Sequence, residues 1–271
     1  MPLLRAPGGH IHYDVQGEGE PIVIINGMCF SARHWLGFDG EMARHFRVIT
    51  IDNRGVGYTT LRATWNLTIS DMASDVIRVL DHLNIERAHI MGVSMGGMIA
   101  LALGLHHAGR CRTLVVINSS IAGTRTMRLT VPAVWRMVRA GRDTHRIAHS
   151  LSDLLSHKAA CGRRRQAVAR SRKAISDREG WPFVTTWKHL LAAMRFDIRH
   201  MLNDMPCPTM ILYGAGDQFV PPTNSHVLHQ AIPHAELRKI HNAGHEISND
   251  QPEELLRAIL SFTASPRQRT A

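Results

Sequence analysis

One serine stands in a sequence context that is typical of enzyme nucleophiles. Ser94 is the centre of Gly92-Val93-Ser94-Met95-Gly96, with a glycine two residues before it and two residues after it. The apolar residues before the motif predict a strand and those after it predict a helix, which is the context that a nucleophile elbow requires. Small residues let the chain turn tightly there, so that the serine projects above a sheet at the positive end of a helix. The pattern therefore predicts that Ser94 is a catalytic nucleophile.

A serine hydroxyl needs a base, because it is a weak nucleophile until its proton is removed. After such a motif, the usual order along the chain is an acidic residue and then a histidine. Asp217 directly follows an apolar run, and His245 follows the last run that resembles a strand. An aspartate in this role holds the imidazole tautomer and stabilises the imidazolium. We therefore predict a Ser94–His245–Asp217 triad.

Each member of the predicted triad has an alternative interpretation. The chain has 18 histidines, and His241 is the nearest rival to His245, although a glycine directly before His245 gives it the tighter loop. Asp217 could instead be a turn residue that caps the following segment. The loop from Asn118 to Ser120, another common place for the acid, contains no carboxylate, and this favours Asp217. His241, His245 and Glu246 lack the His-Glu-x-x-His spacing, so we predict neither a metal site nor a cofactor.

Short apolar runs between turn residues predict the strands that would hold these groups. Because the runs are continuous rather than alternating, they indicate a parallel sheet covered on both faces. In contrast, His10 to Val15 alternates and predicts an antiparallel hairpin at the edge where the sheet starts. The predicted buried strands are Pro21 to Asn26, Val48 to Asp52, Ala88 to Val93, Thr113 to Asn118, Thr209 to Gly214 and, more weakly, Ala235 to Ile240.

Helical patterns separate these strands. Ser70 to Leu83 has one apolar face, Met95 to Leu105 is apolar nearly all round, and Pro252 to Phe262 is amphipathic. Alternating strands and helices predict the α/β class, with a doubly wound and mostly parallel sheet. The chain has 271 residues, a length that α/β folds often reach as one domain.

The alternation breaks over residues 121–203, which contain helical patterns and no convincing strand. We predict a helical cap inserted after the sixth strand, with residues 1–120 and 204–271 forming the core. One helical face of this segment carries Val184, Trp187, Leu191 and Met194. The inner face of the cap is expected to line an apolar pocket for the part of the substrate that Ser94 attacks, an acyl group. Trp187 is a candidate substrate contact there.

The excess positive charge of the chain lies in this predicted cap. The formal net charge is +10, and Gly123 to Arg199 alone contains 17 lysines and arginines against five acidic residues. Such a cluster is compatible with a solvated basic helix face. It is also compatible with docking of an anionic carrier protein or coenzyme A, or with an anionic membrane surface. Nucleic acid is the weakest option, because no nucleic-acid-binding motif accompanies the charge.

Composition also bears on location. The residues from Met1 to Gly9 contain no apolar signal segment, and no apolar run approaches the length of a membrane span. We therefore expect no stable membrane insertion. The cysteines are scattered without a Cys-x-x-Cys pair, as expected for reduced thiols in a cytoplasmic protein. They are Cys29, Cys111, Cys161 and Cys207.

Taken together, these motifs resemble the α/β-hydrolase superfamily, in particular its small serine esterases and enol-lactonase-like members. The resemblance extends from about His10 to Phe262. Asp52 to Thr59 is similar to the family stretch Asp-x-Arg-Gly-x-Gly-x-Ser, with a threonine in place of the serine. We interpret this stretch as a structural loop near the pocket.

The resemblance also implies an oxyanion hole. Asn26-Gly27-Met28 follows a predicted strand at the point where many relatives have His-Gly, so Asn26 departs from the family pattern. By this likeness, the backbone N–H groups of Met28 and Met95 would stabilise the charge that develops on the attacked carbonyl oxygen. Asn26 and Gly27 would lie next to the substrate.

The function implied is hydrolysis of a carboxylic ester through an acyl-enzyme, without a cofactor. The expected substrate is a small or medium ester with an apolar acyl part, and a thioester or lactone is equally compatible with the motifs. Three alternatives stay open, because fold and machinery do not specify the substrate. They are an esterase or thioesterase acting on acyl groups linked to a carrier protein or coenzyme A, a carbon–carbon hydrolase or lyase, and a non-catalytic ligand-binding homologue.

Overall fold

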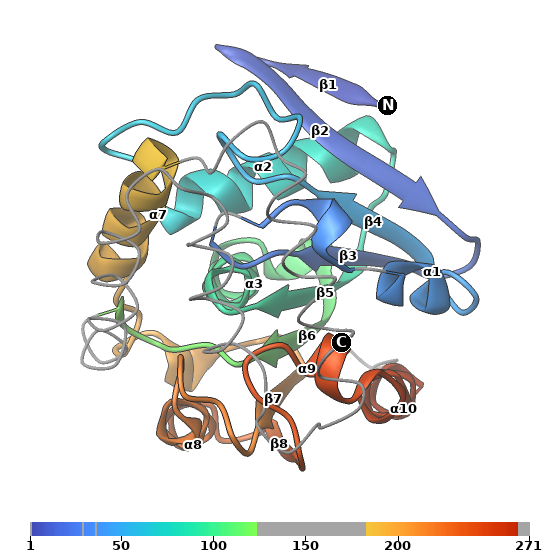
Figure 1. Ribbon diagram of the computed structural model, residues 1–271, viewed down its shortest axis with the longest axis vertical. Helices are drawn as coiled ribbons and strands as arrows, with labels where there is room; N and C mark the ends of the chain where they lie inside the picture. The colour runs from blue at the N-terminus through green and yellow to red at the C-terminus, as the bar shows by residue number, and fades with distance from the viewer. Residues whose placement is uncertain (1, 29, 36, 124–182, 265–271) are drawn as a thin grey trace.

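The computed structural model describes residues 2–28, 30–35, 37–123 and 183–264. Its strands form one eight-stranded sheet in the order β1-β2-β4-β3-β5-β6-β7-β8 (Figure 1). β1 and β2 are antiparallel to their neighbours, and β3 to β8 pair in parallel. The predicted, mostly parallel sheet is therefore confirmed. The strands are β1 (Leu3–Ala6), β2 (Gly9–Gln16), β3 (Pro21–Ile25), β4 (Arg47–Ile51), β5 (Ala88–Val93), β6 (Cys111–Ile117), β7 (Thr209–Gly214) and β8 (Glu236–Ile240).

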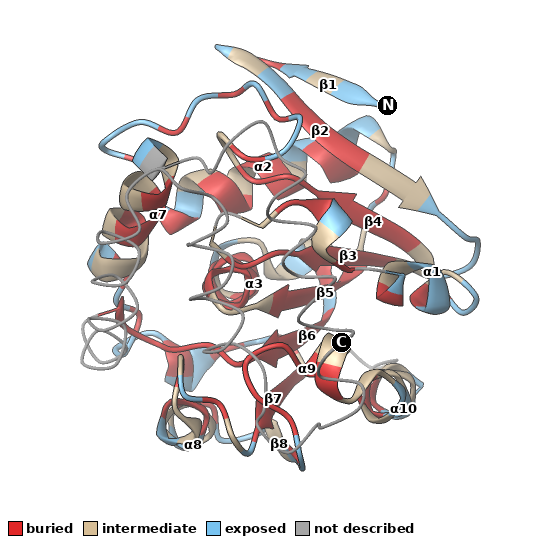
Figure 2. Ribbon diagram, in the orientation of Figure 1, coloured by how far each residue is buried: buried red, intermediate tan, exposed pale blue. Residues whose placement is uncertain are grey.

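Both faces of the central strands are buried, as Figure 2 shows in red. In β3, Ile22 and Ile24 belong to one apolar core, and Val23 and Ile25 belong to the core on the opposite face. Successive side chains of a strand point to opposite faces. A strand that is covered on both faces therefore needs an unbroken apolar run, which is what the sequence provides.

Helices cover the two faces of the sheet. The core on one face contains side chains of α2 (Ile69–His82), α3 (Met95–His106) and α8 (Pro222–Ala231). The core on the other face contains side chains of α1 (Phe38–Met42), α9 (Ile247–Asp250) and α10 (Pro252–Thr263). The doubly wound arrangement is therefore confirmed. Among the described residues, no helix has the length and apolar character that crossing a bilayer would require.

The edge of the sheet differs from the sequence prediction in one respect. The antiparallel hairpin is present, but β2 pairs with β1 on one side and with β4 on the other. β1 has only four residues and two of them are exposed, so its pattern carries little strand signal. In its partner β2, Ile11, His12 and Tyr13 are all buried, and the polar His12 on the second face contacts the buried carboxylate of Asp52.

The described chain resumes with α7 (Phe183–Arg195), which confirms a helix in the segment predicted as a cap. The predicted apolar face is not the buried one, because Val184 is 49% exposed whereas Thr186 and His189 are buried. Polar side chains can be buried when their hydrogen bonds are satisfied. The Nε2–H of His189 donates to the carbonyl of Arg54 at 2.9 Å. Burial lowers the pKa of His189 to about 4, so the ring is neutral at pH 7.

The basic clusters of the predicted cap fall within residues 124–182, outside the described residues. The division into a core and a cap, and docking of an anionic carrier on the cap, therefore stay predictions.

Candidate active site

Ser94 lies between the end of β5 and the start of α3, where its backbone angles are φ 57° and ψ −119°. This conformation is strained for a residue other than glycine and persists only where its surroundings fix it. The Ser94 N–H donates to the carbonyl of Ile117 at 2.9 Å. Its carbonyl accepts from the hydroxyl of Ser119 at 2.7 Å and from the N–H of Gly97 at 2.9 Å. Residues 117 and 119, at and just after the end of β6, and Gly97 thus hold the strained turn through the main-chain atoms of Ser94.

The glycines of the motif are required by close packing. A Cβ on Gly92 would lie 2.1 Å from the carbonyl oxygen of Gly96, and a Cβ on Gly96 would lie 2.2 Å from that of Ile25. The start of α3 therefore packs directly on strands β3 and β5. This contact places Ser94 at the carboxyl end of the sheet, where ligands of open α/β folds bind.

His245 and Asp217 form a buried pair. The Nδ1 atom of His245 lies 2.8 Å from Oδ2 of Asp217, and both residues are at most 5% exposed. The other carboxylate oxygen accepts from the N–H groups of Phe219 and Val220 at 2.8 and 2.9 Å. Asp217 therefore caps a turn and also contacts the histidine, so the two interpretations do not exclude each other, and its catalytic role stays a prediction. An acceptor at Nδ1 places the ring proton there and leaves Nε2 available as a base.

Ser94 and His245 line the same cavity. The ring of Phe219 contacts that of His245 edge to face, with 4.8 Å between the ring centroids. The structure thus brings the three predicted triad residues to one end of the sheet, from the ends of β5, β7 and β8.

Met95 directly follows Ser94 in the chain, and Met28 lines both cavities that Ser94 lines. In the described part of the chain, neither backbone N–H donates to another protein atom, which is compatible with the predicted oxyanion hole. Gly27 lies against the nucleophile, because a Cβ on it would be 3.3 Å from the Cβ of Ser94. Asn26 and Gly27 line the same cavity as Ser94.

Two cavities meet at Ser94. The first includes His34, Trp35 and Glu246 in its lining, and the second includes Met98, Leu190 and Met194. Met28, Ser94 and Phe219 line both. The walls are mainly apolar, as is usual for small-molecule sites. Trp187 is absent from the lining of both, within the described residues, so its role as a substrate contact stays a prediction.

Asn118 is a site residue that no sequence motif predicted. It lies in the loop after β6, whose sequence indicated only that no carboxylate is present there. Its Nδ2 donates to the carbonyls of Gly244 and His245 at 3.1 and 2.8 Å. Its Oδ1 accepts from the N–H of Gly214 at 2.9 Å. One buried carboxamide thus joins the ends of β6 and β7 to the loop that carries His245. The sequence feature that could have indicated this role is an asparagine directly after a strand. Asparagine tolerates the left-handed backbone that Asn118 adopts, with φ 47°.

We expect Asn118→Ala to lower kcat for the proposed ester hydrolysis by about 100-fold with little change in KM, because the His245 loop loses its anchor. The measurement is steady-state kinetics, together with the melting temperature. Asn84→Ala is the matched control, since Asn84 also has a left-handed backbone, with φ 53°, but lies at the end of α2. Equal kcat in the two variants at equal stability would mean that Asn118 has only a structural role.

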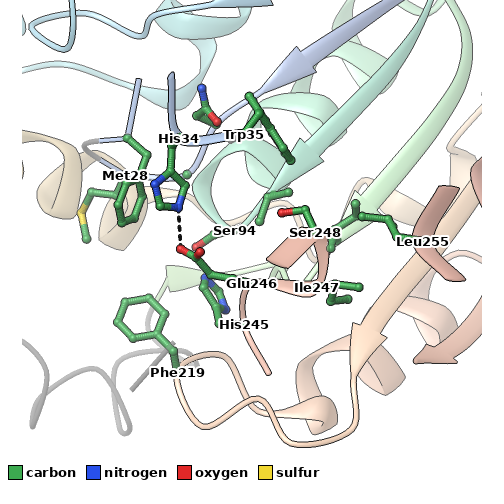
Figure 3. Close-up of a pocket in the computed structure, with 15 residues that line it drawn as sticks. Met28, His34, Trp35, Ser94, Phe219, His245, Glu246, Ile247, Ser248 and Leu255 are labelled. Atoms are coloured by element: carbon green, nitrogen blue, oxygen red, sulfur yellow. Dashed lines mark hydrogen bonds and ion pairs between the residues drawn. The ribbon is translucent and has the colours of Figure 1, made fainter. Parts of the chain in front are cut away.

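His34 and Glu246 form a second pair that the sequence did not reveal. Their Nε2 and Oε1 atoms are 2.6 Å apart, and the amide of Asn249 donates to the other oxygen of Glu246. Burial opposes ionisation of Glu246, but His34, His245 and Asn249 together lower the pKa of its carboxyl. Figure 3 shows Glu246 between His34 and His245. Among the described residues, no group of His, Cys, Asp and Glu side chains is arranged to hold a metal ion.

The loop from Asp52 to Thr59 is built around one carboxylate. Asp52 accepts from the N–H of Ala32 at 2.7 Å and of Tyr58 at 3.0 Å, and it lies 2.9 Å from Nδ1 of His12. The hydroxyl of Thr59 donates to the carbonyl of Asp52 at 2.7 Å, a bond that a serine could also make. The structural interpretation of this loop agrees with these contacts.

Comparison with known proteins agrees with this geometry. The family model of the α/β hydrolase fold matches residues 20–252. The chain is 28% identical over 259 residues to a protein of Agrobacterium fabrum named carbamate hydrolase RutD, covering 93% of this chain and 97% of that protein. It is 25% identical over 252 residues to 3-oxoadipate enol-lactonase 1 of Acinetobacter baylyi, covering 90% and 88% of the two chains.

A solved structure shows the same likeness. Est816, described as an N-acyl homoserine lactone degrading enzyme, superposes with a TM-score of 0.84 at 27% identity. The superposition covers 96% of this chain and all of that one. The matched family model spans strands β3 to β8, the elbow and the loop of His245, and the chain belongs to the α/β hydrolase family.

Proposed function

We propose that this α/β hydrolase cleaves a carboxylic ester or lactone through an acyl-enzyme formed on Ser94. The observation that carries the proposal is the 2.8 Å contact of His245 Nδ1 with Asp217, in a cavity that Ser94 also lines. That contact directs the basic nitrogen of the imidazole away from the aspartate. A nucleophile beside a base that is itself oriented by a third group is the arrangement that covalent acyl transfer requires.

The proposed reaction has two steps. The Ser94 oxygen attacks the acyl carbonyl while its proton passes to Nε2 of His245, and the Met28 and Met95 N–H groups stabilise the oxyanion. The imidazolium then protonates the leaving oxygen, and the acyl group stays on Ser94. In the second step His245 takes a proton from water and the resulting hydroxide attacks the acyl carbonyl of the acyl-enzyme. The bond to the Ser94 oxygen then breaks, the His245 imidazolium returns its proton to that oxygen, and the acid is released. The reaction uses only side chains, main-chain amides and water.

The relatives support the substrate class. Their names describe hydrolysis of a carbamate, of an enol-lactone and degradation of an acyl homoserine lactone. Attack on an acyl carbonyl bonded to a heteroatom is common to ester, lactone and carbamate cleavage. The two mainly apolar cavities favour a small or medium substrate with an apolar acyl part.

The test is to trap the acyl-enzyme. A p-nitrophenyl dialkylcarbamate should release one equivalent of p-nitrophenol and leave a carbamoyl group on the peptide that contains Ser94, because carbamoyl-serines hydrolyse slowly. Peptide mass spectrometry locates the adduct. Ser248→Ala is the control, since Ser248 lines the same cavity and its loss should leave labelling intact. Turnover of acyl esters by a protein that never carries an adduct at Ser94 would contradict the proposal.

A further inference from the structure

Three residues that line the first cavity each have a buried polar atom without a hydrogen-bond partner among the described residues. The atoms are Nδ2 of Asn26, Nδ1 of His34 and Nε1 of Trp35. Asn26 is only 2% exposed and Trp35 only 4%. Buried polar groups in folded proteins are nearly always paired, because an unpaired one forfeits the hydrogen bonds that it would make in water. All three residues line the cavity that contains Ser94, so a bound ligand can supply the missing partners.

The chemistry of these atoms specifies the partner. The carboxamide nitrogen of Asn26 and the indole nitrogen of Trp35 can only donate. The Nε2 atom of His34 contacts the Glu246 carboxylate, which can only accept, so Nε2 carries a proton, and in the neutral tautomer Nδ1 accepts. The His34 ring is held in place by stacking on Phe30, with 4.0 Å between the ring centroids. The cavity therefore presents two donors and one acceptor, which a hydroxyl or an amide can satisfy.

The charges around the cavity favour an uncharged group. Glu246 supplies a carboxylate, and no lysine or arginine is among the described residues that line this cavity. Among the described lining residues, a substrate carboxylate desolvated close to Glu246 would therefore have no compensating lysine or arginine. An ammonium group would leave the donors of Asn26 and Trp35 without an acceptor.

We infer that Asn26, His34 and Trp35, with Glu246 behind His34, form a polar subsite that binds an uncharged hydroxyl- or amide-bearing part of the substrate. This inference rests on the proposed function, since the subsite adjoins the proposed nucleophile. It adds a preference that a purely apolar pocket would not have. Of two linear esters of equal length, the one that ends in a hydroxyl should bind more tightly than the one that ends in a methyl group.

Arylboronic acids test the subsite, because boron accepts the Ser94 oxygen and the adduct resembles the tetrahedral intermediate. Each ligand carries, para to boron, an arm of rising length that ends in a methyl or an isosteric hydroxyl, as in 4-ethylphenyl- and 4-(hydroxymethyl)phenylboronic acid. The rigid ring keeps the hydroxyl from bonding to its own boron. For wild type, the hydroxyl compound of the best-fitting pair should inhibit about tenfold more tightly, since it pairs buried groups that the methyl compound leaves unpaired. The readout is the ratio of the two inhibition constants.

Two variants remove parts of the subsite. His34→Phe combined with Glu246→Leu removes the pair as a unit, so that no unpaired carboxylate stays buried. Trp35→Phe removes a single donor. The double variant should bring the ratio close to one while it still binds the methyl compound, and Trp35→Phe should lower the ratio in part. His226→Phe, at an exposed position on α8, is the control and should keep the wild-type ratio.

The outcomes separate the subsite from the proposed function. If no boronic acid inhibits or binds wild type, the Ser94 nucleophile itself is in doubt. If the methyl compounds bind but the hydroxyl gives no advantage at any length, the subsite is wrong and the proposed function stands. The subsite is equally wrong if carboxylate- or ammonium-terminated analogues bind best, or if the ratio survives in both Trp35→Phe and the double variant.

Discussion

Ser94→Ala is expected to lower kcat for ester hydrolysis by about a million-fold, the scale of losing a triad nucleophile. The loss is chemical, because the hydrogen bonds that hold the elbow use the main-chain N–H and carbonyl of Ser94, which alanine retains. The melting temperature should therefore stay close to that of wild type. The measurement is hydrolysis of p-nitrophenyl esters of rising acyl length, with both proteins assayed side by side.

Ser248→Ala serves as the control in this comparison as well, since it removes another hydroxyl from the lining of the first cavity. Its kcat should stay within about tenfold of wild type, as expected for a group that takes no part in proton transfer or attack. A Ser94→Ala protein that kept most of its turnover would exclude a serine acyl-enzyme. It would instead favour a mechanism in which His245 acts directly on a substrate proton, as in a carbon–carbon hydrolase or lyase.

Asp217→Asn is expected to lower kcat by about 10⁴-fold at neutral pH. The Phe219 and Val220 N–H groups bind one carboxylate oxygen, so in the variant they hold the amide oxygen. The amide nitrogen then faces Nδ1 of His245 as a donor. The imidazole must accept that bond, which shifts its proton to Nε2 and removes the base that Ser94 needs.

Asp52→Asn is a closely matched control for this variant. Asp52 is also buried, also accepts two main-chain N–H groups and also contacts Nδ1 of a histidine, yet it organises a loop and lines neither cavity among the described residues. Both variants should lower the melting temperature. If Asp217→Asn reduced kcat no more than Asp52→Asn, the role of Asp217 would be structural.

The sequence predicted the parts of the fold and site that depend on local spacing. The buried strands follow from continuous apolar runs, and Ser94 follows from its flanking glycines between a strand and a helix. Asp217 and His245 follow from their order along the chain and their positions after strands. The structure places each of them at the carboxyl end of the sheet.

What the sequence could not predict depends on contacts between distant segments. His34 and Glu246 are 212 residues apart, and Asn118 is 127 residues from the carbonyl that it anchors. No short pattern encodes such pairs, because they exist only once the strands are aligned. The apolar face indicated by the sequence is not the buried face of α7, for a related reason. The buried face includes His189, whose ring donates a hydrogen bond to the distant carbonyl of Arg54. Periodicity detects apolar burial and does not detect this kind of contact.

The meeting of two cavities at one serine also matters for redesign of the protein. Among the described residues, only Met28, Ser94 and Phe219 line both cavities, and the remaining walls come from different elements. In the proposed reaction, a substrate that occupies both would have its reacting carbon at Ser94, with one arm beside Trp35 and Leu255 and the other beside Met98 and Leu190. Substitutions without shared contacts tend to have additive effects. Each arm of the substrate can therefore be selected by its own set of mutations, and the two sets can then be combined.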